Sequence, residues 1–441
     1  MKYSIFNTLL PYENGMFLLY NSLRHKVIFL QKELSDVLEH HVALGIDGLK
    51  TVHPDFYGYL SEQNFLVENN FDEIEDIRKI TNQIDNDPFI FLLTVNPTMN
   101  CNFNCWYCYE THVKGSKLTQ EKKDAIKKIM KRISDYEQLK LFSLSFFGGE
   151  PLLYFKNDVI PLIEYALEQQ KGKRHELTLS FTTNGYLINE QFIDYFTIRN
   201  LHPHFQITFD GYRNEHNKVR YIGTKGSYDT IVANIKNLLA AGMHVRARIN
   251  YTNNNIKQAF CIIDDFKELP QRTKDELLVF DFHRVWQTDT KGSDVNAAND
   301  CMKELSDVMR DKGFRTMVRY SPNNMYNSCY ADKRNSVVIN YNGDIFKCTA
   351  RDFTTENRAG YLSSNGELIW DDGYMEKRMN SKLNNKRCLS CNILPLCNGG
   401  CSQHSLEHLN DGKNYCVYTN ADIEINKIIK TKVEEILYAQ A

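Results

Sequence analysis

Between residues 89 and 310, short apolar runs alternate with segments of helical spacing. Six runs have the length and composition of strands: FIFLLTV (89–95), LFSLSFF (141–147), LTLSFTT (177–183), FQITFD (205–210), VRARINY (245–251) and ELLVFDF (276–282). QEKKDAIKKIMKRI (120–133) gathers its apolar residues on one helical face, and SYDTIVANIKNLLAAG (227–242) is a second helix that Gly242 can end. This alternation predicts a parallel α/β sheet with outer helices, a partial (β/α)6 barrel whose sites lie at the C-terminal strand ends.

The first 85 residues have a different pattern. SIFNTLL (4–10) and GMFLLYN (15–21) flank PYENG, in which Asn14-Gly15 favours a tight hairpin turn. HKVIFL (25–30) can add a third strand, and two segments of helical spacing follow: QKELSDVLEHHV (31–42) and FDEIEDIRKITNQI (71–84). This order predicts a winged-helix-like domain over residues 1–85, followed by the linker DNDP (85–88).

A third region begins near residue 311. It combines short strands with many Asn and Gly residues and most of the remaining cysteines. Metal ligation can replace the apolar core that such a segment lacks. The predicted domains are therefore 1–85, 86–310 and 311–441.

Composition narrows the classes of function. The 441 residues are 42% hydrophobic and 24% charged, with 53 basic against 55 acidic side chains. This balance gives no electrostatic reason to expect nucleic acid or an anionic membrane as a partner. No apolar run reaches the ~20 residues that span a bilayer, and Pro11 and Glu13 stand where a signal peptide needs an apolar core. We expect a cytoplasmic protein.

The twelve cysteines are the strongest chemical signal. In a reducing compartment, clustered cysteines are metal ligands more often than disulfides; Cys261 and Cys301 are isolated and are expected to be bystanders. In CNFNCWYCYE (101–110), three cysteines directly follow the first strand of the predicted barrel. A structural zinc site needs a fourth ligand, which His112 could supply. Three thiolates without a fourth ligand instead favour a four-iron cluster with one open iron.

Cys101, Cys105 and Cys108, with aromatic Tyr107 before the third, resemble the signature of the radical S-adenosylmethionine (SAM) superfamily. FFGGEP (146–151) at the end of the next strand agrees, since Gly148 and Gly149 permit close backbone approach and Glu150 offers an acceptor for an ammonium group. GGE alone is a weak motif that also suits a strand-to-helix turn. The resemblance implies that the open iron chelates SAM and that electron transfer then yields a 5′-deoxyadenosyl radical.

Later strand ends extend this resemblance. Thr182 and Asn184 in FTTNG (181–185) could meet the SAM ribose, although Asn184-Gly185 also suits an ordinary turn. Asp210 in ITFDG (207–211) and the following Arg220 complete the expected SAM contacts, together with Tyr107. In the family such an arginine holds the SAM carboxylate; the alternative for Arg220 is a surface arginine.

The C-terminal cysteines resemble the SPASM domain found in one branch of that superfamily. The pattern is Cys329-x13-Gly343-x4-Cys348, then Cys388-x2-Cys391-x5-Cys397-x3-Cys401, and finally Cys416. Two zinc sites are the alternative. The resemblance implies two auxiliary [4Fe-4S] clusters, a distal one on Cys388, Cys391, Cys397 and Cys416, and a proximal one on Cys329, Cys348 and Cys401. Residues 302–328 contain no eighth cysteine, so we expect a proximal cluster that is open or completed by substrate or a non-Cys group.

SPASM enzymes mostly act on peptides or proteins, and two subclasses compete. One modifies ribosomally synthesised precursor peptides. The other, the anaerobic sulfatase-maturating enzymes, makes formylglycine with an Asp base directly after the cysteine that corresponds to Cys348; here that residue is Thr349, and Asp352 is out of register. Residues 1–85 resemble in pattern the element of many peptide maturases that binds a leader peptide by strand addition; the alternative is a scaffolding extension.

We therefore predict a radical SAM peptide maturase that binds SAM and three [4Fe-4S] clusters. It is expected to form a thioether or carbon–carbon crosslink in a leader-bearing precursor peptide, with electrons from a donor such as flavodoxin or ferredoxin. The alternatives are a formylglycine-generating enzyme and a non-catalytic, zinc-stabilised binding protein. The sequence assigns no proton acceptor: Tyr109, Asp210, His283 and Asp352 are candidates by location or type only.

Overall fold

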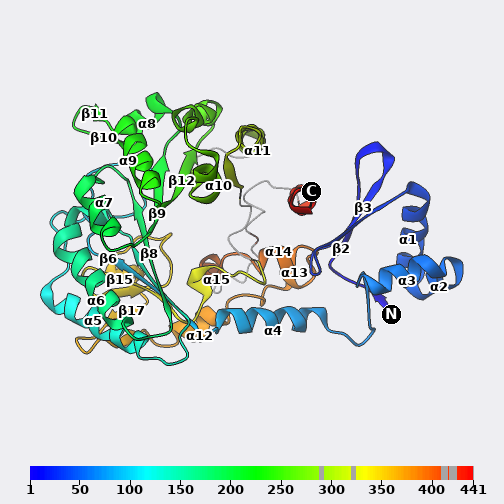
Figure 1. The fold of residues 1–441 in the computed structure, drawn as a ribbon. Coiled ribbons are helices and arrows are strands. Elements are labelled where there is room, and N and C mark those ends of the chain that lie inside the picture. The colour runs from blue at the N-terminus through cyan, green and yellow to red at the C-terminus, as the bar shows by residue number, and fades with distance from the viewer. Residues whose placement is uncertain (288–292, 319–323, 409–415, 417–424, 441) are drawn as a thin grey trace. The chain divides into compact units, whose positions relative to one another are not determined.

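The computed structural model describes residues 1–287, 293–318, 324–408, 416 and 425–440. Figure 1 shows the chain coloured by residue number. The chain divides into two units. The first unit comprises Met1–Asn86, Tyr320–Arg334 and Met375–Ala441, and the second comprises Asp87–Arg319 and Asn335–Tyr374. Within the described residues, no helix has the length and apolar character needed to cross a membrane.

An eleven-stranded sheet organises the second unit, in the order β14-β13-β12-β9-β8-β7-β6-β15-β16-β17-β18. Neighbours from β14 to β15 are parallel, and the last three strands are antiparallel. The bounds are β6 Ile90–Asn96, β7 Leu141–Phe146, β8 Glu176–Thr183, β9 His204–Phe209, β12 His244–Tyr251, β13 Leu278–Arg284, β14 Arg315–Val318, β15 Ser336–Asn340, β16 Asp344–Phe346, β17 Gly360–Leu362 and β18 Leu368–Trp370.

The six strands predicted from the sequence are β6, β7, β8, β9, β12 and β13, and their parallel order is confirmed. The sheet also continues at both ends, where β14 pairs with β13 and β15 pairs with β6. These two strands have only four and five residues, which is too short for periodicity to identify them. Tertiary pairing therefore adds strands that the local pattern does not reveal.

Helices lie along the outer side of this sheet (Figure 1). They are α5 Gln120–Ser134, α6 Ile160–Gln170, α7 Glu190–Thr197, α8 Arg213–Val219, α9 Tyr228–Ala240, α10 Gln271–Glu276 and α11 Ser293–Asp311. Shorter elements are η3 Pro151–Tyr154, the π-helix η4 Phe155–Val159, η5 Ile256–Phe266, η7 Thr355–Asn357, and the strands β10 Tyr221–Ile222 and β11 Lys225–Gly226. The predicted apolar face of α5 is buried, and Gly242 adopts a φ of +74° just after α9, as expected for a helix stop.

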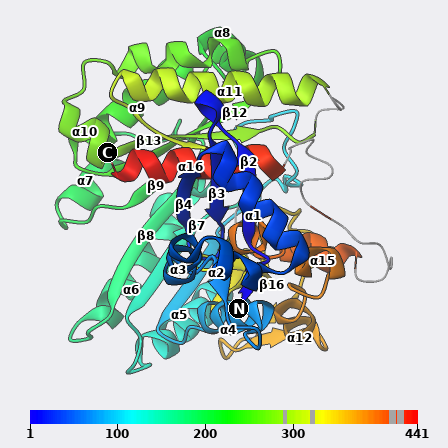
Figure 2. The same cartoon turned by 90° about the vertical axis from the view of Figure 1, so that its right-hand side faces the viewer.

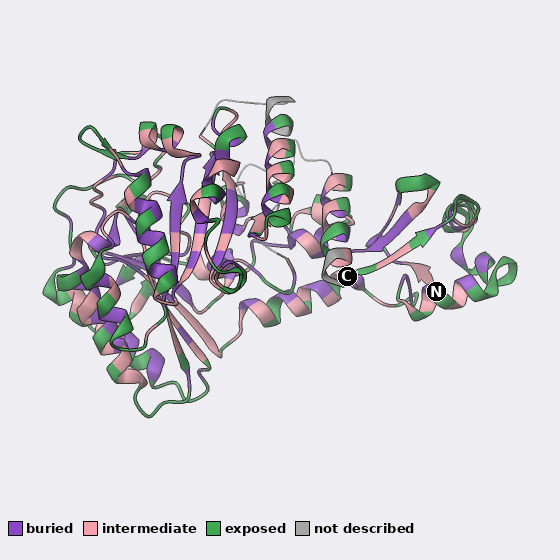
Figure 3. Ribbon diagram, turned by 45° about the horizontal axis from the view of Figure 1, so that its top comes forward, coloured by how far each residue is buried: buried purple, intermediate pink, exposed green. Residues whose placement is uncertain are grey.

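The two faces of the central strands differ in chemistry. Alternate residues such as Leu93, Phe142 and Phe205 are buried in one apolar core with the helices, which Figure 3 shows as purple strands. The residues between them are polar on neighbouring strands, as in the 2.6 Å hydrogen bond between the Ser145 and Ser180 hydroxyls. A strand presents successive side chains to opposite faces. The face away from the apolar core is therefore suited to a polar ligand.

The first unit contains a three-stranded antiparallel sheet, visible with α1 in Figure 2. Its N-terminal elements are β1 Lys2–Tyr3, β2 Asn7–Pro11, η1 Glu13–Gly15, β3 Phe17–Asn21, β4 Lys26–Leu30, α1 Lys32–Leu44, η2 Ile46–Gly48, α2 Leu49–Val52, α3 Pro54–Glu62, β5 Leu66–Val67 and α4 Glu73–Asp85. The predicted strands, the turn at Asn14 (φ 55°) and both predicted helices are present. The helices α2 and α3 were not predicted, and the winged-helix class itself stays a prediction.

The C-terminal region is divided between the units. Residues 335–374 continue the barrel sheet, because β15 pairs with β6. Residues 311–319 also belong to the second unit. The rest, residues 320–334 and 375–441, joins the first unit, where Ile393, Ile428 and Ile429 share a core with Leu10 and Leu18. Its elements are η6 Tyr330–Asp332, α12 Tyr374–Met379 (which starts one residue earlier, in the second unit), α13 Lys386–Leu389, α14 Leu394–Cys397, α15 Ser402–His408 and α16 Ile425–Gln440. The sequence boundary at 310 thus differs from this division, since strand pairing joins segments that are distant in the chain.

Candidate active site

The three-cysteine loop follows β6 at the C-terminal edge of the sheet. Its ends are tied together by the Val113 amide, which donates to the Met99 carbonyl at 3.0 Å, and by the Thr98 hydroxyl, which donates to the Ser116 carbonyl at 2.6 Å. The cysteines therefore lie on a loop whose two ends are held together by hydrogen bonds. Strand β6 places them at the edge where sites of parallel α/β folds occur.

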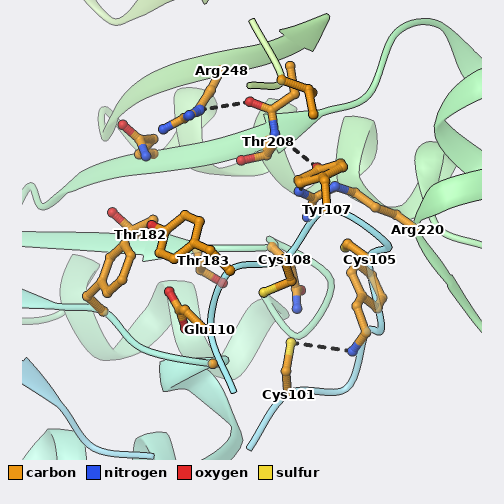
Figure 4. A pocket seen from close by; sticks show the side chains of 18 of the residues that line it. Cys101, Cys105, Tyr107, Cys108, Glu110, Thr182, Thr183, Thr208, Arg220 and Arg248 are labelled. Atoms are coloured by element: carbon orange, nitrogen blue, oxygen red, sulfur yellow. Dashed lines mark hydrogen bonds between the residues drawn. The ribbon is translucent and has the colours of Figure 1, made fainter. Parts of the chain in front are cut away.

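A pocket opens beside this loop (Figure 4). Its lining comes from the C-terminal ends of the central strands and the segments that follow them: Cys101, Phe103, Cys105, Tyr107, Cys108, Tyr109, Glu110, His112, Phe147, Gly148, Gly149, Thr182, Thr183, Asn184, Gln206, Thr208, Arg220, Arg248, Asn250, Arg284, Val285, Trp286 and Gln287. Of the predicted SAM contacts and cluster ligands in this unit, only Glu150, Asp210 and Cys348 are missing from the lining. The tertiary structure therefore gathers residues that are up to 186 positions apart, from Cys101 to Gln287, around one cavity.

The thiols of the loop form an all-sulfur donor set. Burial, with repulsion from Glu150, raises the pKa of Cys101 to about 12, and burial with repulsion from Glu110 raises that of Cys108 to about 11. Burial also raises the pKa of Cys105. Thiols bind metal as thiolates. A cationic iron–sulfur cluster would therefore replace the thiol protons and compensate the cost of burying three negative charges. Sulfur ligands of this kind select iron–sulfur clusters or zinc.

His112, the residue that could close a zinc site, is near the loop: its Nε2 lies 3.6 Å from the Cys108 sulfur. Nevertheless, in the described part of the chain no three His, Cys, Asp or Glu side chains converge on a position for one metal ion. A cube does not require such convergence, because each thiolate binds a different iron. The arrangement is compatible with a cluster ligand set.

The two glycines of FFGGEP pack directly against the base of the cysteine loop. The Gly149 and Glu150 amides donate to the Thr98 and Asn100 carbonyls at 3.1 and 2.9 Å. A Cβ on Gly148 would lie 2.5 Å from the Thr98 oxygen, and one on Gly149 would lie 2.4 Å from the Asn100 oxygen. The predicted close backbone approach is therefore present, and its partner is the cysteine loop.

Gly149→Ala should weaken cluster loading. The added methyl group would force the Asn100 backbone, one residue before Cys101, out of place, and overpacking of this kind costs about 1–3 kcal/mol. Iron per chain after anaerobic reconstitution and the urea midpoint are the measurements. Gly58→Ala in α3 is the control, because a Cβ there meets no atom within 4 Å. Wild-type iron content in Gly149→Ala would contradict the expectation.

Glu150 is completely buried beneath the pocket. Its carboxylate accepts hydrogen bonds from the Thr183 hydroxyl at 2.7 Å, the Asn184 amide at 2.8 Å and the Leu152 amide at 3.0 Å. Burial raises the pKa of Glu150, and these hydrogen bonds oppose the rise. In this structure Glu150 joins the end of β7 to the end of β8. Asn184 continues the connection, since its Nδ2 donates to the Asn102 Oδ1 at 2.7 Å.

Tyr107 connects the cysteine loop to β9 and β12. Its hydroxyl donates to the Asp210 carboxylate at 2.8 Å and accepts hydrogen bonds from Arg220 at 2.8 Å and from the Asn250 amide at 2.9 Å. Arg220 also forms a close ion pair with Asp210. Burial opposes the charge of Arg220, but Cys105, Tyr107 and Asp210 together raise its pKa. Arg220 is therefore a buried residue that lines the pocket, and the surface alternative is wrong.

The proton-acceptor candidates have different surroundings. The Tyr109 hydroxyl donates to the Thr349 carbonyl at 2.7 Å. Asp352 accepts hydrogen bonds from the Thr111 amide and hydroxyl at 2.8 and 2.6 Å. Nε2 of His283 lies 3.0 Å from the Asp281 carboxylate. Asp352 thus holds the cysteine loop, while Tyr109 alone of these residues lines the pocket.

Several pocket residues were not identified from the sequence. Gln206 and Thr208 on β9, Arg248 and Asn250 on β12, and Glu110 all contribute to the lining. Burial, followed by repulsion from Asp352 and Glu150, raises the pKa of Glu110 to about 8. The period-two spacing of polar residues in FQITFD and VRARINY was a usable signal, because alternate strand residues share a face.

The predicted distal ligands are close enough to interact electrostatically within the first unit. Burial, with repulsion from Cys388, Cys391 and Cys416, raises the pKa of Cys397 to about 12. Burial and two of the same neighbours raise that of Cys388 to about 11. Of the predicted proximal ligands, Cys329 and Cys401 belong to the first unit and Cys348 to the second, and their assignment stays a prediction.

Comparisons with known proteins show what this chain is similar to. Residues 95–256 match the model of the Radical SAM superfamily. The radical SAM cyclopropyl synthase TigE of Paramaledivibacter caminithermalis is 24% identical over 79% of this chain and 76% of its own length. The cysteine-type anaerobic sulfatase-maturating enzyme of Clostridium novyi is also 24% identical, over 71% and 88%. SuiB of Streptococcus suis, solved with its precursor peptide SuiA, aligns with a TM-score of 0.53 and 18% identity over 94% and 98%.

The matched segment contains the three-cysteine loop, the glycine pair and Arg220. The alternative of a non-catalytic zinc-stabilised binding protein is therefore rejected. The family implies SAM and one [4Fe-4S] cluster, and the all-sulfur loop beside a polar pocket fits both. Residues 95–256 of this chain thus carry a radical SAM domain, and the chain is similar to radical SAM enzymes that include an anaerobic sulfatase-maturating enzyme.

Proposed function

We propose that this enzyme modifies a ribosomally synthesised precursor peptide and forms a thioether or carbon–carbon crosslink. The observation that carries the proposal is the pocket in which the cysteine loop, the glycine pair and the polar ends of β8, β9 and β12 meet. The relative TigE is described as a cyclopropyl synthase, and SuiB was solved with a precursor peptide. The bond and the peptide are proposals for this chain.

Each part of the pocket has a proposed task. Cys101, Cys105 and Cys108 would hold the cluster, which together with SAM supplies the radical that abstracts hydrogen. The proposed SAM contacts that line the pocket are Tyr107, Gly148, Gly149, Thr182, Asn184 and Arg220. Glu150 and Asp210 support them from below through Asn184 and Arg220. The auxiliary clusters on the C-terminal cysteines are proposed acceptors for the electron that a crosslinked product must lose.

The proposed leader site is the edge of the N-terminal sheet. In the described residues β4 pairs only with β3, and the opposite edge strand, β2, ends in Pro11. Proline lacks an amide donor for a new strand, so β4 is the better edge for strand addition. Phe29 on β4 is 39% exposed and offers apolar contact to an added strand.

The test uses the reconstituted enzyme, SAM, a reductant and a candidate precursor peptide, sought among short reading frames next to this gene. We expect 5′-deoxyadenosine and a peptide that has lost a pair of hydrogen atoms, both detected by mass spectrometry. A tethered leader raises the effective concentration of the core, so a leaderless peptide should react about 100-fold more slowly. Equal rates for the two peptides would contradict leader recognition, and SAM cleavage without a modified peptide would contradict the proposed reaction.

Sulfatase maturation is the second candidate, favoured by the Clostridium novyi relative. Against it, Thr349 occupies the position of the expected base, and Asp352 already accepts two hydrogen bonds from Thr111. A cysteine-type sulfatase motif peptide distinguishes the candidates, since formylglycine would appear only if this chain is a sulfatase-maturating enzyme.

A further inference from the structure

Arginine is concentrated on the part of the pocket that β12 and β13 supply. Arg248 from β12 and Arg284 from β13 line it, in addition to Arg220, and Glu110 is the one carboxyl group in the described lining. Figure 4 shows Arg248 on the opposite side of the pocket from Cys101. The proposed cluster and SAM contacts lie mostly toward the cysteine loop. The region around Arg248 is therefore available to bind a group other than the cluster and SAM.

Arg248 is oriented by a hydrogen bond and has no direct ion pair, although the Asp281 carboxylate on the neighbouring strand β13 attracts its charge. Its Nε donates to the Asn250 Oδ1 at 2.8 Å, and the Asn250 Nδ2 donates to the Tyr107 hydroxyl at 2.9 Å. The Asn255 amide fixes Asn250 in turn, by donating to its carbonyl at 3.0 Å. In the part of the chain that the structure describes, Arg248 forms no ion pair, and its terminal nitrogens donate no hydrogen bond.

The other arginines of this region differ. Arg220 is paired with Asp210, and Arg246, two residues before Arg248 on the same strand, lies 3.8 Å from the Asp281 carboxylate and does not line the pocket. A guanidinium that is largely removed from water is stabilised most by a carboxylate. The planar guanidinium can bind a carboxylate through two parallel hydrogen bonds. In contrast to Arg220 and Arg246, Arg248 is left by its geometry with this capacity for a ligand.

We propose that Arg248 determines specificity by binding the side-chain carboxylate of an Asp or Glu residue in the core of the peptide substrate. This inference rests on the proposed function and adds the class of residue that the pocket accepts. Trp286, which also lines the pocket and is 61% exposed, provides apolar contact area for the residues beside that acid. The bound acid would fix the register of the peptide relative to the cysteine loop.

The carboxylate of SAM could also bind Arg248. The experiment therefore distinguishes a carboxylate of the peptide from the carboxylate of SAM. The reconstituted enzyme with saturating SAM is titrated with acetyl-Ala-Xaa-Ala-amide peptides in which Xaa is Glu, Gln, Asp or Asn. Saturation-transfer NMR, which detects weak binding, gives each dissociation constant. Wild type, Arg248→Gln, Arg248→Lys and the off-pocket control Arg246→Gln are compared, and the Kd for SAM is measured for each by equilibrium dialysis.

We expect wild type to prefer the acidic peptide over its amide isostere by about tenfold or more, as for a charged hydrogen-bonded pair. Arg248→Gln should lose this preference, Arg248→Lys should keep part of it, and Arg246→Gln should keep all of it.

The proposal is overturned if wild type shows no preference for the acidic peptide, which includes the case that no peptide binds. It is also overturned if the preference survives in Arg248→Gln. A SAM affinity that falls in Arg248→Gln while wild type shows no acidic preference assigns the arginine to SAM. Because binding is measured without turnover, failure of the proposed reaction appears separately, as absence of a modified precursor.

Discussion

Replacing Cys101, Cys105 and Cys108 together by Ala will abolish SAM cleavage and remove about a third of the iron. A four-iron cluster holds four irons, so three clusters predict about twelve irons in wild type and about eight in the variant. The loss of activity is complete because no other thiol among the pocket-lining residues can bind the cluster. Iron and sulfide per chain and 5′-deoxyadenosine formation are measured after anaerobic reconstitution.

The matched control is Cys261→Ala combined with Cys301→Ala. These thiols lie on η5 and α11 and do not line the pocket, so the double variant should keep its iron and its SAM cleavage. Stoichiometric zinc with little iron in wild type would contradict the cluster assignment. A wild-type count near four, reduced to almost none in the triple variant, would confirm the first cluster and contradict the auxiliary ones.

Lys382→Met will destabilise the first unit by about 3–5 kcal/mol, the cost of breaking a buried ion pair by removing one partner. The Lys382 ammonium lies 2.6 Å from the Asp85 carboxylate and 3.2 Å from that of Asp332. Arg378 completes the group at 3.9 Å from Asp332, and all four side chains are at most 5% exposed. The variant leaves two buried carboxylates with one cation. Urea unfolding of the reconstituted protein, followed by circular dichroism, measures the effect.

Two variants test whether the effect comes from burial. Lys432→Met removes a surface pair, 2.9 Å from Glu435 with both side chains more than a third exposed, and should cost less than about 1 kcal/mol. Lys382→Met combined with Asp85→Leu restores charge balance and should recover part of the loss, because an apolar replacement of both partners is often tolerated. Equal destabilisation by Lys382→Met and Lys432→Met would contradict the role of the buried network.

The sequence by itself determined the six central strands, the outer helices and the chemistry of the cysteine loop. These features are local: strand and helix periods, a glycine turn and closely spaced thiols are properties of short segments. The buried face of α5 and the close approach of Gly148 and Gly149 were predictable for this reason. The resemblance to the radical SAM superfamily followed from the same short motifs.

Only the tertiary structure decided which distant residues meet. The pairing of β15 with β6, the burial of Arg220 against Asp210 and Tyr107, and the three hydrogen bonds that Glu150 accepts all join segments far apart in the chain. Arg248 and Arg246 are alternate residues of one strand with the same local pattern. Asp281 on β13 stands in register with Arg248, yet its carboxylate lies 3.8 Å from Arg246, while a hydrogen bond to Asn250 turns Arg248 toward Tyr107 and the pocket. Local periodicity fixes the face of a strand on which a residue lies, but long-range packing fixes the charge that the residue meets there.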